Sequence, residues 1–310
     1  MKRVFRTAAM AVLLCILLPV TARAERLLIP VGRVIGIQLQ SGSVTVTAFD
    51  DALGAAAREA GLRIGDEIVK INDCGITCAR DVRTVLEQSG SAAVPTVRRG
   101  SRLSTVPVKL TESGGQPRLG VYLRQGIAGI GTVTWYDPVT KLFGTLGHGV
   151  SDGKGKLINM TAGQAFEAEI LSVTKGKCGD PGQLKGSADT GNICGTLLRN
   201  TPQGVFGTTD RGWPGTGLPA AGYNEIKTGP AVILSSVDNG GPREYSVEIL
   251  KIYPEDRSDC RNLLLRVTDP DLLAATGGIV QGMSGSPIIQ NGKLVGAVTH
   301  VLVMNPVRNI

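Results

Sequence analysis

Short apolar runs separated by turn residues recur along the chain and predict a mainly β protein with little helix. In the N-terminal part, the runs RVIGIQLQ and SGSVTVTAF predict strands, and GAAAREAGLRIGDEIVKIND predicts a short helix, a tight turn and a further strand. Farther on, CARDVRTVLEQ predicts a helix that ends near Gly90, and AVPTVRRGSRLSTVPVKL predicts a hairpin. We therefore expect one folded unit over residues 26–112.

A polar stretch that contains Gly and Pro, TESGGQPRLG, follows this unit and predicts a linker. Beyond it, candidate strands follow one another at short intervals, a spacing typical of a barrel or of paired barrels. The candidates are GIGTVTWYD, KLFGTLGHG, AFEAEILSV, PAVILSSV, EYSVEILKIY, NLLLRVTD, SPIIQ and LVGAVTHVLV. We therefore expect a second, β-rich domain over residues 113–310.

The charge and the N-terminal segment indicate where the protein is located. The formal net charge is +7, but the basic residues are scattered, which favours a soluble surface or weak membrane attraction over nucleic-acid binding. The chain starts with the basic MKRVFR, continues with the apolar AAMAVLLCILLPV and then has Ala22-Arg23-Ala24. This order is typical of a signal peptide. We expect residues 1–24 to be a signal peptide or a retained membrane anchor, and the rest to lie outside the cytoplasm.

The cysteines indicate no metal site. Of the six, Cys15 lies in the N-terminal signal segment. Cys178 and Cys194 flank a Gly-rich segment and are candidates for a disulfide. Cys74 and Cys78 have C-x3-C spacing, but no histidine is near them in sequence, so we predict no zinc site. We expect no cofactor either.

The stretch GMSGSP, residues 282–287, is a poor start for a strand and a good tight turn. Such a turn can present the hydroxyl of Ser284, while the backbone N–H groups of Gly282 and Ser284 converge as an oxyanion hole. A structural loop with a surface serine is the alternative. The pattern favours nucleophilic catalysis only if a base lies near the hydroxyl.

The chain has two histidines from which such a base could come. His148 follows a predicted strand and has glycines on both sides, which exposes the ring and lets another segment approach. His300 lies at the end of the strand that follows the serine turn, a position that favours the wall of a substrate site. We therefore predict His148 as the general base.

The N-terminal unit resembles a PDZ domain. The resemblance rests on GLRIGDEI, residues 61–68, followed by Lys70-Ile71-Asn72. It places the carboxylate-binding loop of that family at Val34-Ile35-Gly36-Ile37. A PDZ domain binds a peptide as an added strand, so the resemblance implies a peptide ligand at Ile35, Gly36 and Ile37.

The second domain resembles the trypsin-like peptidases and, more closely, the SpoIVB peptidase family. GTLGHGVSD together with GGIVQGMSGSPIIQNGKLVGAVTHV carries the closer resemblance. It implies a trypsin-like, β-barrel-type serine peptidase domain after a PDZ domain, with His148 as base and Ser284 as nucleophile. It also implies Asp269 as the acid and substrate contact by Thr299 and His300.

Asp269 has an alternative role that the residues themselves indicate. It is followed by Pro270, and Gly277 stands seven residues farther on, which is the pattern of a helix N-cap, N1 proline and helix stop. Asp271, Asp152 and Asp137 are other candidates for the acid.

The family resemblance implies a biological setting as well. It indicates an endopeptidase in intercompartment signalling during sporulation, exported to the forespore intermembrane space. There it would cut itself and a membrane-embedded regulator, which leads to activation of a late sigma factor. A catalytically inactive PDZ scaffold and a secreted adaptor for the cell envelope are the alternatives.

Overall fold

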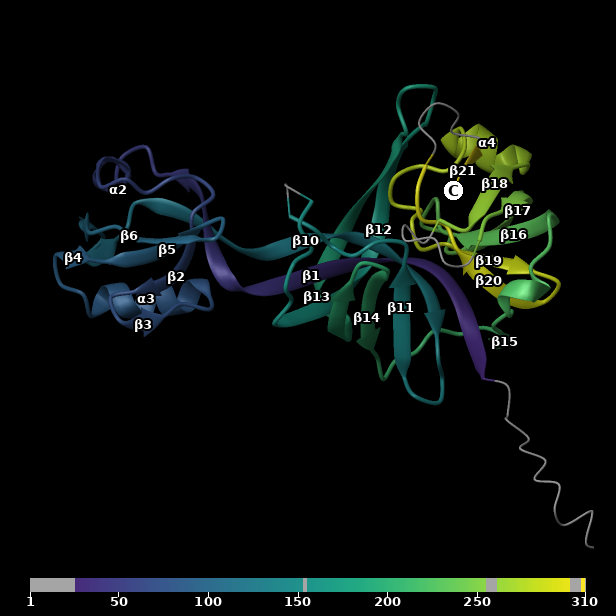
Figure 1. Ribbon diagram of the computed structural model, residues 1–310, viewed down its shortest axis with the longest axis horizontal. Coiled ribbons are helices and arrows are strands. Elements are labelled where there is room, and N and C mark those ends of the chain that lie inside the picture. The colour runs from purple at the N-terminus through teal and green to yellow at the C-terminus, as the bar shows by residue number, and fades with distance from the viewer. Residues whose placement is uncertain (1–25, 153–154, 255–260, 302–307, 310) are drawn as a thin grey trace, which may run out of the picture.

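The computed structural model describes residues 26–152, 155–254, 261–301 and 308–309, and it is mainly β, as predicted (Figure 1). The predicted signal segment and Cys15 lie outside these residues. Within the described residues, no helix has both the length and the apolar character needed to cross a membrane.

Six antiparallel strands close into a first barrel. Each strand pairs with the next, and the last pairing, between β1 and β10, closes the ring. Ile35, Leu39 and Phe143 are fully buried in its core, because alternate residues of each strand point inward. The strands, in order around the barrel, are β1 (Leu27–Phe49), β10 (Val121–Tyr136), β11 (Leu142–Leu146), β14 (Gly204–Thr208), β13 (Gln183–Thr201) and β12 (Ala162–Thr174).

A second sheet of six strands has its own core beside the barrel. Ile233, Ile249 and Leu265 are buried in that core together with Leu272 of helix α4 (Pro270–Thr276). In spatial order its strands are β20 (Lys293–Ala297), β19 (Pro287–Gln290), β16 (Gly229–Ser235), β17 (Arg243–Ile252), β18 (Leu263–Val267) and β21 (Arg308–Asn309). The connection to it includes β15 (Leu218–Pro219), which pairs with β1, and the 3-10 helix η1 (Tyr223–Glu225).

A small unit with a third core stands apart from the two large sheets (Figure 1). It contains the second half of β1 and the start of β10, which pair from Val44 with Gln125 to Phe49 with Val121. Its other elements are α2 (Ala55–Glu59), β2 (Glu67–Ile71), β3 (Cys74–Gly75), α3 (Ala79–Glu87), β4 (Ala92–Ala93), β5 (Pro95–Arg99), β6 (Arg102–Thr105), β7 (Val108–Lys109), β8 (Thr111–Ser113) and β9 (Gln116–Arg118). The predicted helix, turn, strand and hairpin all occur in this unit.

The small unit is an insertion into the first barrel. The chain leaves the barrel along β1, folds the small unit and returns along β10, which pairs with β1 in both units. The predicted boundary at residue 112 is therefore displaced, since the first half of β1 belongs to the barrel and the start of β10 to the small unit. An alternating apolar pattern predicts a strand but does not say which sheet the strand joins.

The predicted carboxylate-binding loop at Ile35, Gly36 and Ile37 is wrong. These residues are part of β1 inside the barrel, where β10 pairs with one edge of β1 and β12 with the other. Ile35 is fully buried, and a Cβ on Gly36 would lie 2.3 Å from the Cβ of Ala188. No strand edge is free here for a peptide. The PDZ resemblance of the small unit itself stays a prediction.

Cys194 carries a free thiol, so the predicted bridge between Cys178 and Cys194 is not formed. Cys178 is exposed, whereas Cys194 lies in the barrel core, where burial raises the pKa of its thiol to about 11.

Candidate active site

Ser284 lies in a glycine turn between α4 and β19. Gly282 and Gly285 have φ angles of +98° and +101°, a backbone conformation that residues other than glycine strongly disfavour. The Ser284 hydroxyl donates to the backbone carbonyl of Thr299 at 3.2 Å. The GMSGSP sequence therefore forms the predicted turn and carries the hydroxyl at its centre.

His148 lies directly after β11, between two glycines that both allow close backbone packing. Gly147 has a φ of +129°, and a Cβ there would lie 2.4 Å from Ser284 Oγ. A Cβ on Gly149 would lie 2.2 Å from the carbonyl oxygen of Thr201. The first glycine thus lets the serine turn approach the histidine segment, and the second lets that segment pack on the barrel.

One cavity of about 490 Å³ brings most of the predicted site residues together. Its lining comes from the first barrel and the second sheet and includes His148 and His300, whose ring centroids are 6.3 Å apart. Nδ1 of His300 lies 2.9 Å from Oγ1 of Thr299. The lining residues predicted for the peptidase site are His148, Gly282, Ser284, Thr299 and His300, and Ile37 from the predicted peptide-binding loop lines the cavity as well.

The backbone N–H groups of the turn fall into two sets. Those of Met283, Gly285 and Ser286 donate to the carbonyls of Val280, Val298 and Met283, respectively. Those of Gly282 and Ser284 have no acceptor within the described part of the chain. An oxyanion hole requires two such donors without a partner in the turn that carries the nucleophile, so these two N–H groups are the candidates for it.

The β12–β13 hairpin of the first barrel supports this turn, a contact that no sequence signal indicates. The Leu184 N–H donates to the Gln281 carbonyl at 2.8 Å, and the Gln281 N–H donates to the Gly182 carbonyl at 3.2 Å. Leu184 belongs to the core of the second sheet, although its strand is part of the barrel. The serine turn is therefore held by both halves of the molecule.

Asp269 does not line the cavity. It is the N-cap of α4, where its Oδ1 accepts from the N–H groups of Asp271 and Leu272, each at 3.0 Å. Its Oδ2 accepts from the Ser246 N–H at 3.2 Å. Among the described residues no Asp or Glu lines the cavity, so the candidate acids Asp271 and Asp152 do not line it either. The role of Asp269 as acid stays a prediction.

If Asp269 serves only as this cap, Asp269→Asn should retain turnover within about threefold, because asparagine caps a helix nearly as well as aspartate. Asp269→Ala should lower the free energy of unfolding by about 1 kcal/mol through the lost cap. Peptide hydrolysis and thermal melts measure the two effects. A fall in turnover of roughly 10⁴-fold in a well-folded Asn variant would assign the orienting role to Asp269 after all.

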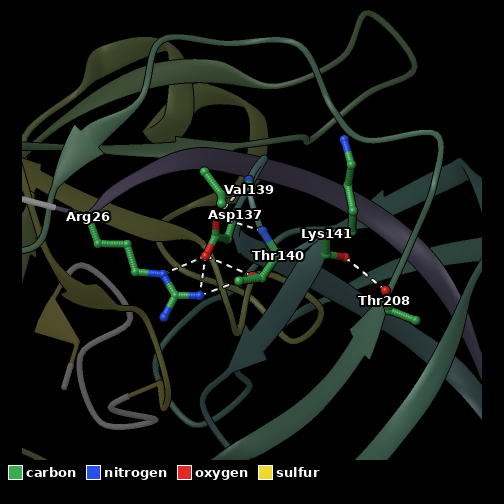
Figure 2. Close-up of polar contacts among 6 residues, drawn as sticks. All are labelled: Arg26, Asp137, Val139, Thr140, Lys141 and Thr208. Atoms are coloured by element: carbon green, nitrogen blue, oxygen red, sulfur yellow. Dashed lines mark hydrogen bonds and ion pairs between the residues drawn. The ribbon is translucent and has the colours of Figure 1, made fainter. Parts of the chain in front are cut away.

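Asp137, another candidate acid, has a structural role (Figure 2). Its side chain is fully buried and forms an ion pair with Arg26, at the start of β1. Burial alone would raise the pKa of this carboxyl, but hydrogen bonds from Thr140, the Val139 N–H and Arg26 outweigh it and lower the pKa to about 2. Asp137 thus stabilises the β10–β11 turn and binds it to the residue that precedes β1.

Comparison with known proteins assigns the part of the chain that contains the cavity to a family. A search of curated proteins found no match. The family model described as SpoIVB peptidase S55 matches residues 115–309, which include every residue of the cavity lining except Ile37. The chain therefore belongs to the SpoIVB peptidase S55 family and is a peptidase.

Proposed function

We propose that the chain is a trypsin-like serine endopeptidase in which Ser284 is the nucleophile and His148 the general base. The observation that carries this proposal is one cavity lined by Ser284, His148 and Gly282, with the backbone N–H groups of Gly282 and Ser284 free of acceptors among the described residues. These are the components that acyl transfer by a serine needs.

The proposed reaction follows from these positions. His148 takes the Ser284 hydroxyl proton as Oγ attacks the scissile carbonyl carbon, and the oxyanion accepts from the N–H groups of Gly282 and Ser284. The protonated imidazole then gives its proton to the leaving amine as the C–N bond breaks. Water, deprotonated by the same histidine, hydrolyses the acyl-enzyme and regenerates the Ser284 hydroxyl.

A backbone carbonyl supports the orientation of the base. Nδ1 of His148 lies 3.2 Å from the carbonyl oxygen of Gly149, and a carbonyl oxygen can only accept. A proton on Nδ1 therefore satisfies this contact and leaves Nε2 unprotonated, which is the tautomer that a base toward serine needs. Thr299 and His300 also line the cavity, and we assign them to substrate contact.

An active-site serine probe tests the proposal. A fluorophosphonate should label the wild-type protein at Ser284, as located by peptide mass mapping, and the His148→Gln variant should react far more slowly. The purified protein should also hydrolyse an unfolded protein substrate. A folded protein that neither reacts nor hydrolyses would support the alternatives, an inactive scaffold or an envelope adaptor.

We also propose that the small unit binds a peptide C-terminus, at a groove other than the one expected from the sequence. A cavity of about 300 Å³ lies between α3 and residues 116–123. Beside it, β10 is an edge strand, because no described strand pairs with its second edge over Val121–Gln125. Arg83 and Arg118 line the cavity and offer positive charge to a carboxylate, with Asp50 the one acidic lining residue.

Two exposed arginines on α3 provide a matched test of this groove. Arg83 lines the cavity, whereas Arg80 on the same helix does not. A pool of peptides with free C-termini should bind the wild type and the Arg80→Glu variant, and Arg83→Glu should weaken binding at least about tenfold by placing like charge beside the carboxylate. Equal binding of the same pool with amidated C-termini, or equal binding by both variants, would contradict the proposal.

The family and the N-terminal pattern support a signalling role. We propose export to the forespore intermembrane space, self-cleavage, and cleavage of a membrane-bound regulatory protein that leads to activation of a late sigma factor. The peptide groove would then regulate cutting of protein substrates. Intact-mass measurement tests self-cleavage, since the wild type should shorten over time and a Ser284→Ala variant should not. The same fragments in both would attribute the cut to another protease.

A further inference from the structure

Two threonines of the first barrel hold the backbone of the serine turn. Thr132 donates through Oγ1 to the Gly282 carbonyl at 2.9 Å, and Thr134 donates through Oγ1 to the Gly285 carbonyl at 2.7 Å. Both lie in β10 and are at most 1% exposed. Val133 between them points into the barrel core, so the two hydroxyls share the face of β10 that meets the turn.

These two bonds fix the peptide groups on either side of Ser284. A peptide group is planar, so an anchored carbonyl also sets the direction of the N–H that follows it. The anchored groups join Gly282 to Met283 and Gly285 to Ser286, and the N–H groups of Met283 and Ser286 both donate within the turn. The turn packs closely as well, since a Cβ on Gly285 would lie 2.3 Å from the carbonyl oxygen of Thr132.

Thr134 also contacts the segment that carries the histidine. Its Oγ1 accepts from the Leu146 N–H at 2.8 Å while it donates to the Gly285 carbonyl. Leu146 is the last residue of β11 and precedes Gly147-His148. One buried hydroxyl therefore joins the backbone that carries the base to the backbone that carries the nucleophile.

We propose that Thr134, assisted by Thr132, is a positioning residue that sets the placement of Ser284 relative to His148. The inference rests on the proposed serine-peptidase function and adds a residue to it. Thr134 touches neither the substrate nor the reacting atoms, since it is absent from the cavity lining. It acts by fixing two backbone segments that come from different sheets.

Thr134→Val keeps the shape of the side chain and removes both hydrogen bonds. We expect kcat to fall about 10- to 100-fold with KM within about threefold, because a displacement of the order of 1 Å between reacting groups costs about that much. Thr134→Ser restores the hydroxyl and should recover kcat to within about threefold. A folded Thr134→Val protein with normal kcat would overturn the proposal.

The matched control is Thr208→Val in β14 of the same barrel. Thr208 donates through Oγ1 to the Lys141 carbonyl at 3.1 Å, just before the start of β11 and therefore at the end of that strand away from His148 (Figure 2). Its loss should lower the melting temperature slightly and leave kcat within about twofold. An equal kcat loss in both variants would mean that any lost barrel hydrogen bond has this effect, and would overturn the proposal.

Two further measurements keep the test decisive. If Thr134→Val does not fold, Thr132→Val removes the bond to Gly282. Because Thr132 also lines the cavity, this variant should lower kcat more than Thr208→Val does while KM stays within about threefold. If the wild type neither reacts with a serine probe nor hydrolyses peptides, the proposed function has failed, but hydrogen exchange still tests positioning. Amides of residues 282–286 should then exchange faster in Thr134→Val than in Thr208→Val, and equal rates would refute the role of Thr134.

Discussion

Replacing Ser284 with alanine is expected to lower kcat for peptide hydrolysis by roughly 10⁴- to 10⁶-fold while the fold stays intact. Loss of the nucleophile of a serine peptidase typically costs this much. The side chain is partly buried, and its one hydrogen bond to a described residue runs to the Thr299 carbonyl, so its removal should hardly change the free energy of unfolding. Turnover measured beside a thermal melt separates the two effects.

Ser286 serves as the control for Ser284. It is fully buried, and its hydroxyl donates to Ser235 Oγ at 2.9 Å, away from the cavity. Ser286→Ala should therefore lower stability by about 1 kcal/mol, the usual value of one buried hydrogen bond, and leave kcat within about threefold. The opposite ranking of the two serines would mean that Ser286 is the nucleophile, and near-normal turnover in both variants would rule out serine catalysis.

Local features of the fold could be predicted because they depend on neighbouring residues. The pattern Thr132-Val133-Thr134 predicts a strand with one apolar face, and Val133 indeed lies in a core. Asp269 before Pro270, with Gly277 beyond, predicts a helix cap and stop, and α4 has both. Turn residues likewise marked the positions of Ser284 and His148.

Long-range pairing could not be predicted, because it depends on partners about a hundred residues apart. Gly36 lies in a Gly-containing apolar stretch that suits a loop beside a strand edge, yet it pairs with Ile130 on one side and Phe166 on the other. The same limit applies to the site. No local pattern shows that Leu184 supports the turn or that Thr134 joins the segments that carry Ser284 and His148.

The close approach of Gly147 to Ser284 leads to the second large effect. An alanine at position 147 would place its Cβ 2.4 Å from Ser284 Oγ, a distance that real structures do not tolerate. Because the turn is anchored on both sides of Ser284, the hydroxyl must rotate away from the cavity or the histidine segment must move. We expect Gly147→Ala to lower kcat at least about 10²-fold, as misplacement of reacting groups by the order of 1 Å does.

Gly155→Ala separates this steric effect from backbone strain. Gly155 has a φ of +78°, and a Cβ there would have no atom of the described residues within 4 Å, so its substitution costs left-handed strain of about 1 kcal/mol without touching Ser284. Gly147→Ala should lose more stability than Gly155→Ala in thermal melts, because its Cβ also clashes with Ser284 Oγ, and only Gly147→Ala should lose kcat and fluorophosphonate labelling. Gly147 adjoins His148, and a Cβ at position 147 would point at Ser284. Normal labelling in a folded Gly147→Ala protein would therefore mean that the histidine segment and the serine turn do not lie this close together in the reactive enzyme.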